Sequence, residues 1–481
     1  MIRVGLFLAG FCCGPAIAFS QDPVLLESVQ RRSDEGWTTA QKIWELAEPG
    51  YQEHESSALL SLWLEREGFK VERGVAGMPT AFTATIGEGL PVIAILGEYD
   101  ALPGLSQDAV PTQQPRFGSY GHGCGHHLFG VASLMAAAAV GDQIQAGTLK
   151  GTLRYYGCPA EEGGSAKVFM VREGLFQDVT AVLHWHPSSR NSGGEASSLA
   201  RIAVKFRFHG KSAHASSSPE DGRSALDGVE LTAHAAELLR EHIPSEARIH
   251  HVITQGGDAP NVVPAEAEVY FYIRHPKATV VAKLYERLLH CAQGAALATE
   301  TELEVKYEGG IVELLPNQTL SEVVLKTLQQ QNNLSYSEEE AQFALKLQES
   351  FTNREPLDRI KDIATKTGMG LGKGSTDVGD VSWVVPTAGF SAACWVPGTP
   401  GHSWQAVACG GTTIARQGMN MAARTLALSA AELFSHPELL AQAREEHLKR
   451  LEGIKYTPLI LPEQKPPLDY RKAKTLIKDT P

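Results

Sequence analysis

The sequence predicts an α/β protein in which a smaller α+β unit is inserted into a larger α/β sandwich. Residues 91–96 (PVIAIL) form a continuous apolar run, which is typical of a buried parallel strand. Segments with strand-like and helix-like patterns then alternate as far as residue 199, which is the pattern of an α/β domain. From Ala200 the pattern changes to strands with one apolar face, and the α/β pattern resumes after about Val312.

The larger unit is expected in two parts, residues 21–199 and residues 312–455. Helical spacing of apolar residues and short apolar runs define its elements. The first part is expected to contain helical segments between 33 and 68 and at 129–140, and strands at 69–75, 81–86, 91–96, 152–156 and 179–183. The second part is expected to contain a charged peripheral stretch at 338–367 and a helical stretch at 429–451.

The inserted unit is expected at residues 200–311. Its elements follow in the order strand, helix, strand, strand, helix, strand, which predicts a four-stranded antiparallel sheet of the ferredoxin-like type. The strands are expected at 201–209, 250–254, 267–273 and 302–307, and the helices at 224–242 and 278–297. Residues 456–481 are rich in proline and lysine and are expected to form a tail on the surface.

The first 20 residues have the pattern of a secretory signal. Arg3 precedes an apolar run that is too short to span a bilayer, and small residues allow cleavage after Ala18 or Ser20. We therefore expect a periplasmic or secreted protein that is not anchored in a membrane. After cleavage 42 basic and 55 acidic residues remain, a charge of about −13, which argues against nucleic-acid binding. Five cysteines without regular spacing do not indicate a disulfide framework.

The densest group of candidate ligands lies at residues 121–127 (GHGCGHH). It contains three histidines and Cys124, and these side chains are preferred ligands of zinc. The glycines allow the backbone to turn sharply, so that side chains two residues apart can converge. The group precedes an apolar helix, and open α/β sheets bind ligands at the carboxyl ends of their strands.

Three further groups of candidate residues also follow strands or lie in loops. Residues 158–164 (CPAEEGG) place two adjacent carboxylates after a buried strand, where one can bind a metal and the other can take a proton from water. Residues 184–187 (HWHP) end another strand, and either histidine could point at the site because residues two apart face the same side. Residues 400–404 (PGHSW) contribute a histidine late in the chain.

These motifs resemble those of the two-metal aminoacylase/carboxypeptidase family of metallopeptidases, and within it those of aminobenzoyl-glutamate hydrolases and auxin-conjugate hydrolases. The matching segments occur in family order over nearly all of the mature chain. They are GVAGMPTAF (74–82), GEYDALPGLSQ (97–107), GHGCGH (121–126), PAEEGG (159–164), WHP (185–187), GKSAHA (210–215), PNVVPA (260–265), GSTDVGDVSW (374–383) and GTPGHSW (398–404).

The resemblance implies a metallopeptidase α/β sandwich with an inserted lid and dimerisation domain, and two divalent metal ions, zinc or manganese. It implies that Cys124 bridges the two metals where many relatives use aspartate. The other implied ligands are His126, Glu162, His186 and His402. Asp100, His184 and His127 are implied to support the ligands from behind, although His127 could instead be an extra ligand. Glu98 stands where many relatives have a ligand histidine, so its role as a ligand stays open.

The resemblance also implies the reaction, hydrolysis of the amide bond of an N-acyl or N-aroyl amino acid. Glu161 would be the general base that takes a proton from the metal-activated water. His214 would reach across a homodimer to polarise the scissile carbonyl, and Asn261 and Arg274 would hold the small-molecule substrate.

Two alternatives stay open at this point. The same site could belong to a dipeptidase or carboxypeptidase, because only the pocket would differ. A non-catalytic metal-binding or ligand-binding relative is a second alternative, against which the complete set of ligand motifs argues. A serine hydrolase is disfavoured because the sequence has no G-x-S-x-G motif in suitable surroundings.

Overall fold

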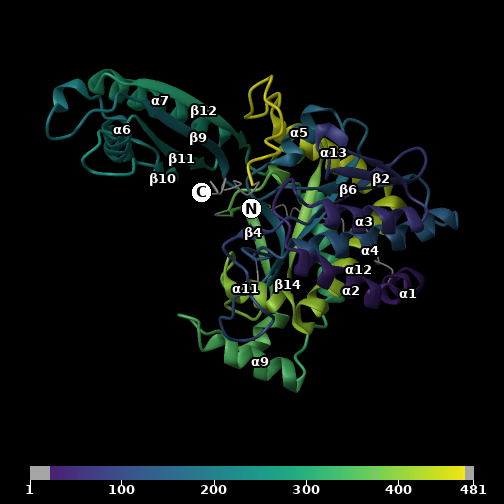
Figure 1. Ribbon diagram of the computed structural model, residues 1–481. Helices are drawn as coiled ribbons and strands as arrows, with labels where there is room; N and C mark the ends of the chain where they lie inside the picture. The colour runs from purple at the N-terminus through teal and green to yellow at the C-terminus, as the bar shows by residue number, and fades with distance from the viewer. Residues whose placement is uncertain (1–21, 117, 373, 472–481) are drawn as a thin grey trace, which may run out of the picture.

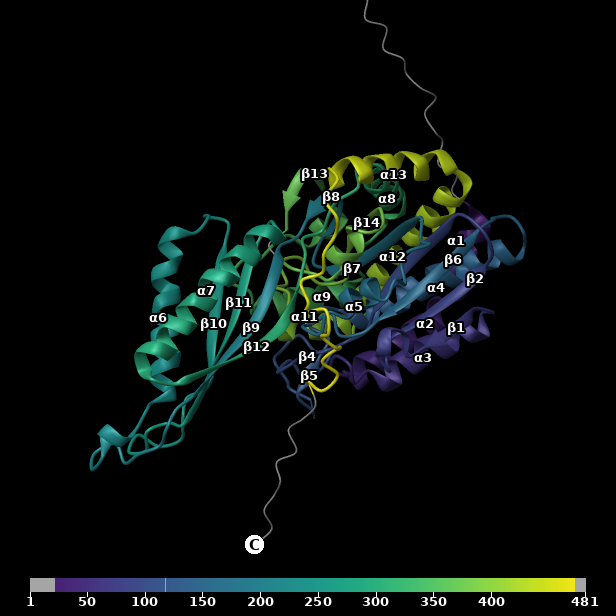
Figure 2. The same cartoon turned by 90° about the horizontal axis from the view of Figure 1, so that it is seen from above.

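The computed structural model describes residues 22–116, 118–372 and 374–471 (Figure 1). The predicted signal segment at 1–20 and the last residues of the predicted tail lie outside the described residues. The chain forms a large body around an eight-stranded sheet, and a smaller unit with its own four-stranded sheet projects from one side of it (Figures 1 and 2).

The large sheet is mixed and has the order β1-β2-β6-β3-β7-β14-β8-β13. Its central strands β6, β3, β7 and β14 run parallel, so their carboxyl ends meet at one edge of the sheet. The strands are β1 (Lys70–Arg73), β2 (Phe82–Gly87), β3 (Val92–Glu98), β6 (Thr152–Cys158), β7 (Ala181–Ser188), β8 (Asn191–Ser197), β13 (Ile363–Leu371) and β14 (Thr387–Ala393). A separate small ladder joins β4 (Leu102–Pro103) to β5 (Tyr120–Gly121).

Helix α4 (His126–Gln145) lies at the centre of the large body. It packs against β3, β6 and β7 on one side and against α12 (Thr413–Ser435) on the other. Its length and composition would allow it to cross a membrane, but 89% of its apolar window is buried inside the protein. It is therefore the core helix of the sandwich, and its amino end carries His126 to the edge where the strands end.

The remaining helices of the large body surround this core. Helices α1 and α2 pack on α4, and α8 packs on β8 and β14. The helices are α1 (Pro23–Arg31), α2 (Ser33–Leu46), α3 (His54–Arg66), α5 (Ala166–Arg172), α8 (Gln318–Gln331), α9 (Glu338–Gln348), α10 (Val378–Ser382), α11 (Trp404–Gly410) and α13 (Pro437–Leu451).

The helical stretch expected at residues 429–451 is two helices, and α12 ends at Ser435 before α13 begins at Pro437. Proline has no amide hydrogen and its ring excludes the preceding turn, so it begins a new helix here instead of continuing the old one.

The smaller unit has the strand order β10-β11-β9-β12, with every pair antiparallel. Helices α6 and α7 pack on one another and cover this sheet around a separate apolar core. Its elements are β9 (Ala200–His209), α6 (Ala225–Leu239), β10 (Arg248–Gln255), β11 (Glu266–His275), α7 (Ala278–Thr299) and β12 (Glu302–Ile311). The predicted element order is thus observed, and β9 and β12 join this unit to the large body.

Candidate metal centre

The four predicted ligand motifs meet at the carboxyl edge of the large sheet, around a cavity of about 730 Å³. β3 ends at Glu98, β6 is followed by residues 159–164, and β7 carries His184 and His186. The loop before α4 and the loop before α11 close the same region. The cavity is lined by Glu98, Cys124, Glu161, Glu162, His184, His186 and His402, among others. Parallel strands produce this convergence because their ends face one side.

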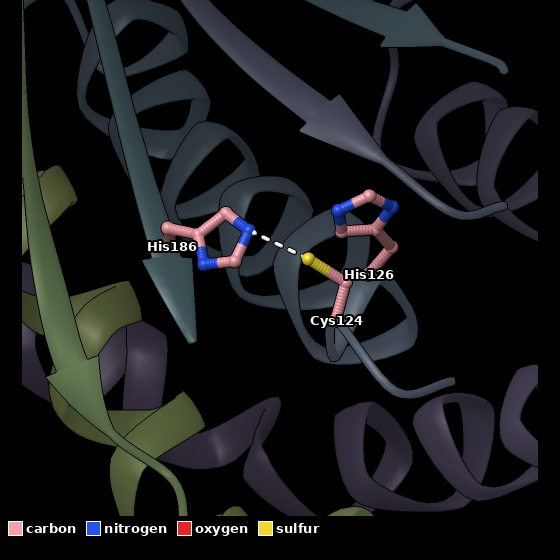
Figure 3. A group of neighbouring side chains, drawn as sticks. All are labelled: Cys124, His126 and His186. Atoms are coloured by element: carbon pink, nitrogen blue, oxygen red, sulfur yellow. Dashed lines mark hydrogen bonds between the residues drawn. The ribbon is translucent and has the colours of Figure 1, made fainter. Parts of the chain in front are cut away.

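Cys124, His126 and His186 form the first group of three donors (Figure 3). The Sγ atom of Cys124 lies 3.3 Å from Nε2 of His186. Nδ1 of His186 lies 2.6 Å from the carbonyl oxygen of Pro187 and donates to it, which leaves Nε2 as the nitrogen with a lone pair. Gly125 has φ of +77°, and this left-handed turn brings His126 back beside the thiol.

Cys124, Glu162 and His402 form a second group, so the thiol belongs to both. Nε2 of His402 lies 3.2 Å from Oε1 of Glu162. In each group the donor atoms lie within 4.8 Å of one another. Oε1 of Glu162 and Nε2 of His126 are both buried without a hydrogen-bond partner. Thiolate, imidazole and carboxylate donors at such spacing suit one divalent cation in each group.

Asp100 orients one donor of each group. Its Oδ1 atom lies 2.7 Å from Nδ1 of His126, and its Oδ2 accepts a hydrogen bond of 2.9 Å from the backbone N–H of Glu162. The contact fixes the tautomer of His126 and turns its Nε2 toward Cys124. A carboxylate behind a ligand histidine is the usual support of a protein metal site.

Glu161 lies beside the two groups, and it forms a third cluster with Glu98 and His126. Burial, and then the negative charges of Glu98 and Glu162, raise the pKa of Glu161 well above its ordinary value. The preceding residue, Ala160, has φ of +53°, and its N–H donates to the buried carboxylate of Glu53 at 2.8 Å. Glu53 therefore holds the turn that presents Glu161 and Glu162.

Glu98 is tied to a buried lysine that the motif analysis did not identify. Its Oε1 atom lies 2.6 Å from Nζ of Lys167, which is also 2.6 Å from Oδ1 of Asp377. The other carboxylate oxygen of Glu98 lies 3.2 Å from Nε2 of His126. Burial raises the pKa of Glu98, but the positive charge of Lys167 outweighs it and the net shift is downward. Lys167 thus keeps Glu98 ionised at the edge of the cavity.

His127 and His184 take different positions. Nε2 of His127 lies 3.1 Å from the carbonyl oxygen of Gly410, and its ring packs on His122 at 4.8 Å between centroids. Burial lowers the pKa of His127 well below its ordinary value, so the ring is neutral and part of the core. His184 lines the cavity, and the absence of a side chain at Gly389 makes room for its ring.

The three residues predicted from the inserted unit separate into two places. Arg274, on β11, lines the cavity and lies 3.3 Å from Oγ of Ser375. His214 and Asn261 lie on two loops that contact one another, through the backbone bond from Ala215 to Asn261, and both are exposed. Neither lines the cavity of its own chain.

Comparison with known proteins gives the same family that the motifs indicate. The model of the peptidase dimerisation domain matches residues 199–299. The chain is 42% identical to a p-aminobenzoyl-glutamate hydrolase of Escherichia coli strain K12, over 85% of this chain and 91% of that protein. It is 28% identical to the Xaa-Arg dipeptidase of Mus musculus, over 89% and 92% of the two chains.

Solved structures share the fold. One is a dinuclear metal-binding peptidase of the M20 family from Bacillus subtilis, with a TM-score of 0.56 and 18% identity over 84% of this chain and 99% of that chain. Another is an aminobenzoyl-glutamate utilization protein from Klebsiella pneumoniae, with a TM-score of 0.61 and 18% identity over 85% and 98%.

The contact between Asp100 and His126 predicts a weakened metal site in Asp100→Asn. The variant loses the charge that holds the imidazole, so we expect metal affinity to fall roughly 10- to 100-fold. Competition with a chromogenic chelator measures this. Asp108→Asn is the control, because Asp108 is exposed in the following loop. Equal affinity in Asp100→Asn and the parent would contradict the role assigned to Asp100.

Proposed function

The chain belongs to the M20 family of metallopeptidases, and we propose that it hydrolyses the amide bond of N-aroyl or N-acyl amino acids such as p-aminobenzoyl-glutamate. It is an amide hydrolase of this family, as its similarity to the p-aminobenzoyl-glutamate hydrolase of Escherichia coli indicates. One observation carries the proposal for the site. Two groups of three metal donors share Cys124, and Glu161 lies beside both.

The donors would hold two divalent cations, with zinc or manganese as the candidates. Cys124, His126 and His186 would hold one, and Cys124, Glu162 and His402 the other. Without a cation, burial and the charge of Glu162 raise the pKa of the Cys124 thiol, whereas a bound cation favours the thiolate. When bound, such cations lower the pKa of water and polarise a carbonyl oxygen.

Glu161 would take the proton of the attacking water and deliver it to the leaving nitrogen. Its raised pKa suits both halves of this transfer, because a carboxylate with an ordinary pKa accepts a proton only weakly near neutrality. The turn braced by Glu53 keeps Glu161 at the cavity. Glu162 is the next residue, so the same turn can present one carboxylate as a ligand and the other as a base.

His214 would complete the site from the partner subunit of a homodimer. Its Nδ1 atom accepts hydrogen bonds from the N–H groups of Ser216 and Ser217, at 3.2 and 3.1 Å. The neutral ring therefore carries its proton on Nε2, which can donate to the oxygen that becomes negative during attack. The exposed position of His214 and the match of residues 199–299 to a dimerisation domain support this arrangement.

We also propose that the protein is exported. Support comes from the sequence of residues 1–20, which has the charge, apolar run and cleavage site of a secretory signal. The five cysteines outside this segment are all free thiols.

Release of the free amino acid tests the proposed reaction. Purified protein should hydrolyse p-aminobenzoyl-glutamate or a related N-acyl amino acid, lose activity after chelation and regain it when zinc or manganese is restored. Absence of hydrolysis on N-acyl amino acids and dipeptides alike, with metal bound, would favour the non-catalytic alternative.

Glu161→Gln should lose turnover while it keeps its metal. Removal of a general base lowers kcat by about 100- to 10,000-fold, and the amide fills the same volume. Metal content and Tm should match those of the parent. Glu173→Gln is the control, because Glu173 is an exposed carboxylate beyond the same helix. Parental kcat in Glu161→Gln would show that another group is the base.

Two inactive variants should complement one another if His214 acts across a dimer. Co-expression of His214→Ala with Glu161→Gln in equal amounts makes half of all dimers mixed, and each mixed dimer has one intact site. We therefore expect about a quarter of parental activity from the mixture. If the mixture stays as inactive as its parts, while mixed dimers are detected by differential tagging, His214 acts within its own chain or not at all.

A further inference from the structure

The wall of the cavity that faces the metal donors is strongly cationic. Arg201, Arg274 and Arg471 all line this cavity. The first two lie on β9 and β11 of the inserted unit, and Arg471 lies in the segment after α13. The carboxylates of the cavity, in contrast, all come from the large sheet. A substrate in the cavity would therefore meet metal donors on one side and guanidinium groups on the other.

Arg201 and Arg274 are placed where like charges are normally avoided. They are directly opposite one another in the antiparallel pairing of β9 with β11. Both guanidinium groups lie over the ring of Tyr272, at 4.7 and 5.6 Å from its centroid. Arg201 is only 8% exposed. Like charges directly opposite on a sheet destabilise it, and burial makes this worse because water no longer screens them.

No acidic group of the described chain compensates this pair. Arg201 donates to Oγ of Ser165 and Arg274 to Oγ of Ser375, each at 3.3 Å, and both acceptors are neutral. The Nε atom of each arginine is buried without a hydrogen-bond partner. A guanidinium group has five N–H donors in a planar fork that fits a carboxylate. Each of these two arginines therefore has unused donors in the cavity.

The third arginine is brought to the cavity by the C-terminal segment, residues 452–471. In Figure 2 this segment runs between the inserted unit and the large body. Gln464 donates to the carbonyl oxygen of Glu308 on β12 at 3.0 Å, and Gln52 of the large body donates to that of Leu468 at 2.8 Å. The segment ends with Arg471 donating to the carbonyl oxygen of Glu162 at 2.9 Å, while its Nε atom is buried without a partner.

We propose that these three arginines form a subsite for two carboxylates, so that the enzyme selects amides of dicarboxylic amino acids and Arg201 binds the side-chain carboxylate. The proposal rests on the amide hydrolysis proposed above and names the substrate class. A single carboxylate can neutralise one guanidinium group of the opposed pair, whereas a dicarboxylic amino acid supplies one carboxylate for each.

The position of Arg274 decides which carboxylate each arginine binds. The pKa of His402 is raised, chiefly by its contact with Glu162, and the charge of Arg274 is near enough to oppose that shift. The α-carboxylate is attached to the carbon that bears the scissile nitrogen, so it lies nearer the metal donors and belongs with Arg274. Arg201 and Arg471 remain for the side-chain carboxylate. The same three charges would repel a product with an arginine side chain.

Matched substrates test the subsite. The p-aminobenzoyl amides of glutamate and glutamine have almost the same size and differ in the charge of the side chain. In the parent we expect kcat/KM for the glutamate amide to be higher by at least about 30-fold, as expected for a buried guanidinium–carboxylate pair. In Arg201→Met this preference should fall to a few-fold, mainly through the glutamate amide. Arg444→Gln, at an exposed position on α13, should keep the parental preference.

Thermal unfolding separates this role from a structural one. If Arg201 serves only the ligand, its removal relieves the opposed charges, and Arg201→Met should unfold at the same or a higher Tm than the parent in buffer. Saturating glutamate should raise the Tm of the parent, whereas glutamine should not, and Arg201→Met should lose this response. Arg471→Gln should lose part of the preference and part of the response.

The outcomes are distinguishable from failure of the reaction itself. Hydrolysis of both amides with equal kcat/KM would overturn the subsite while leaving the proposed function intact. If neither amide is hydrolysed, the Tm response still decides, because equal shifts with glutamate and glutamine would overturn the subsite. A lower Tm in Arg201→Met with an unchanged preference would show that the residue is structural.

Discussion

The thiol of Cys124 lies between two imidazole–carboxylate groups, and the rest of the site is arranged around it. The thiol reaches this position because the chain turns at Gly125 into the first turn of α4, whose apolar body is fixed in the core. Around it the parallel strands β3, β6 and β7 end together, so Glu162 and His186 arrive from different strands at the same point. So many buried donors are stable together only where cations can bind among them.

Behind the donors lies a second layer of buried charge that keeps them in place. Asp100 bridges His126 and the backbone of Glu162, and Glu53 holds the N–H of Ala160. Burial, and then the charge of Asp100, raise the pKa of Glu53 to about 8. Lys167 joins Glu98 to Asp377 across three segments of the chain. The geometry of the site therefore depends on residues that never touch substrate, and the inserted unit adds cations only from the opposite wall.

The parts of this arrangement that the sequence predicted are those encoded locally. Strand β3 is an unbroken apolar run, and the glycine-rich group at 121–127 contains both its turn and its donors. Lys167 and Asp377 were not identified because their pairing joins residues far apart in sequence, and a lone lysine in an amphipathic segment is ordinarily exposed. Strand β8 (Asn191–Ser197) carries glycine and serine instead of an apolar pattern, so only its pairing with β13 and β14 reveals it. The opposed arginines likewise depend on the register of β9 with β11.

The most direct test of this account is the coordination of cobalt by the thiol of Cys124. Metal-free protein would be titrated with Co²⁺ while thiolate-to-metal charge-transfer absorption is recorded, in the parent and in Cys124→Ser. The account predicts two bound ions per chain in the parent, with the absorption increasing during the binding of both, and no such absorption in the variant. Absorption that is complete after one ion, or binding of two ions without any thiolate absorption, would contradict a thiol shared between the two donor groups.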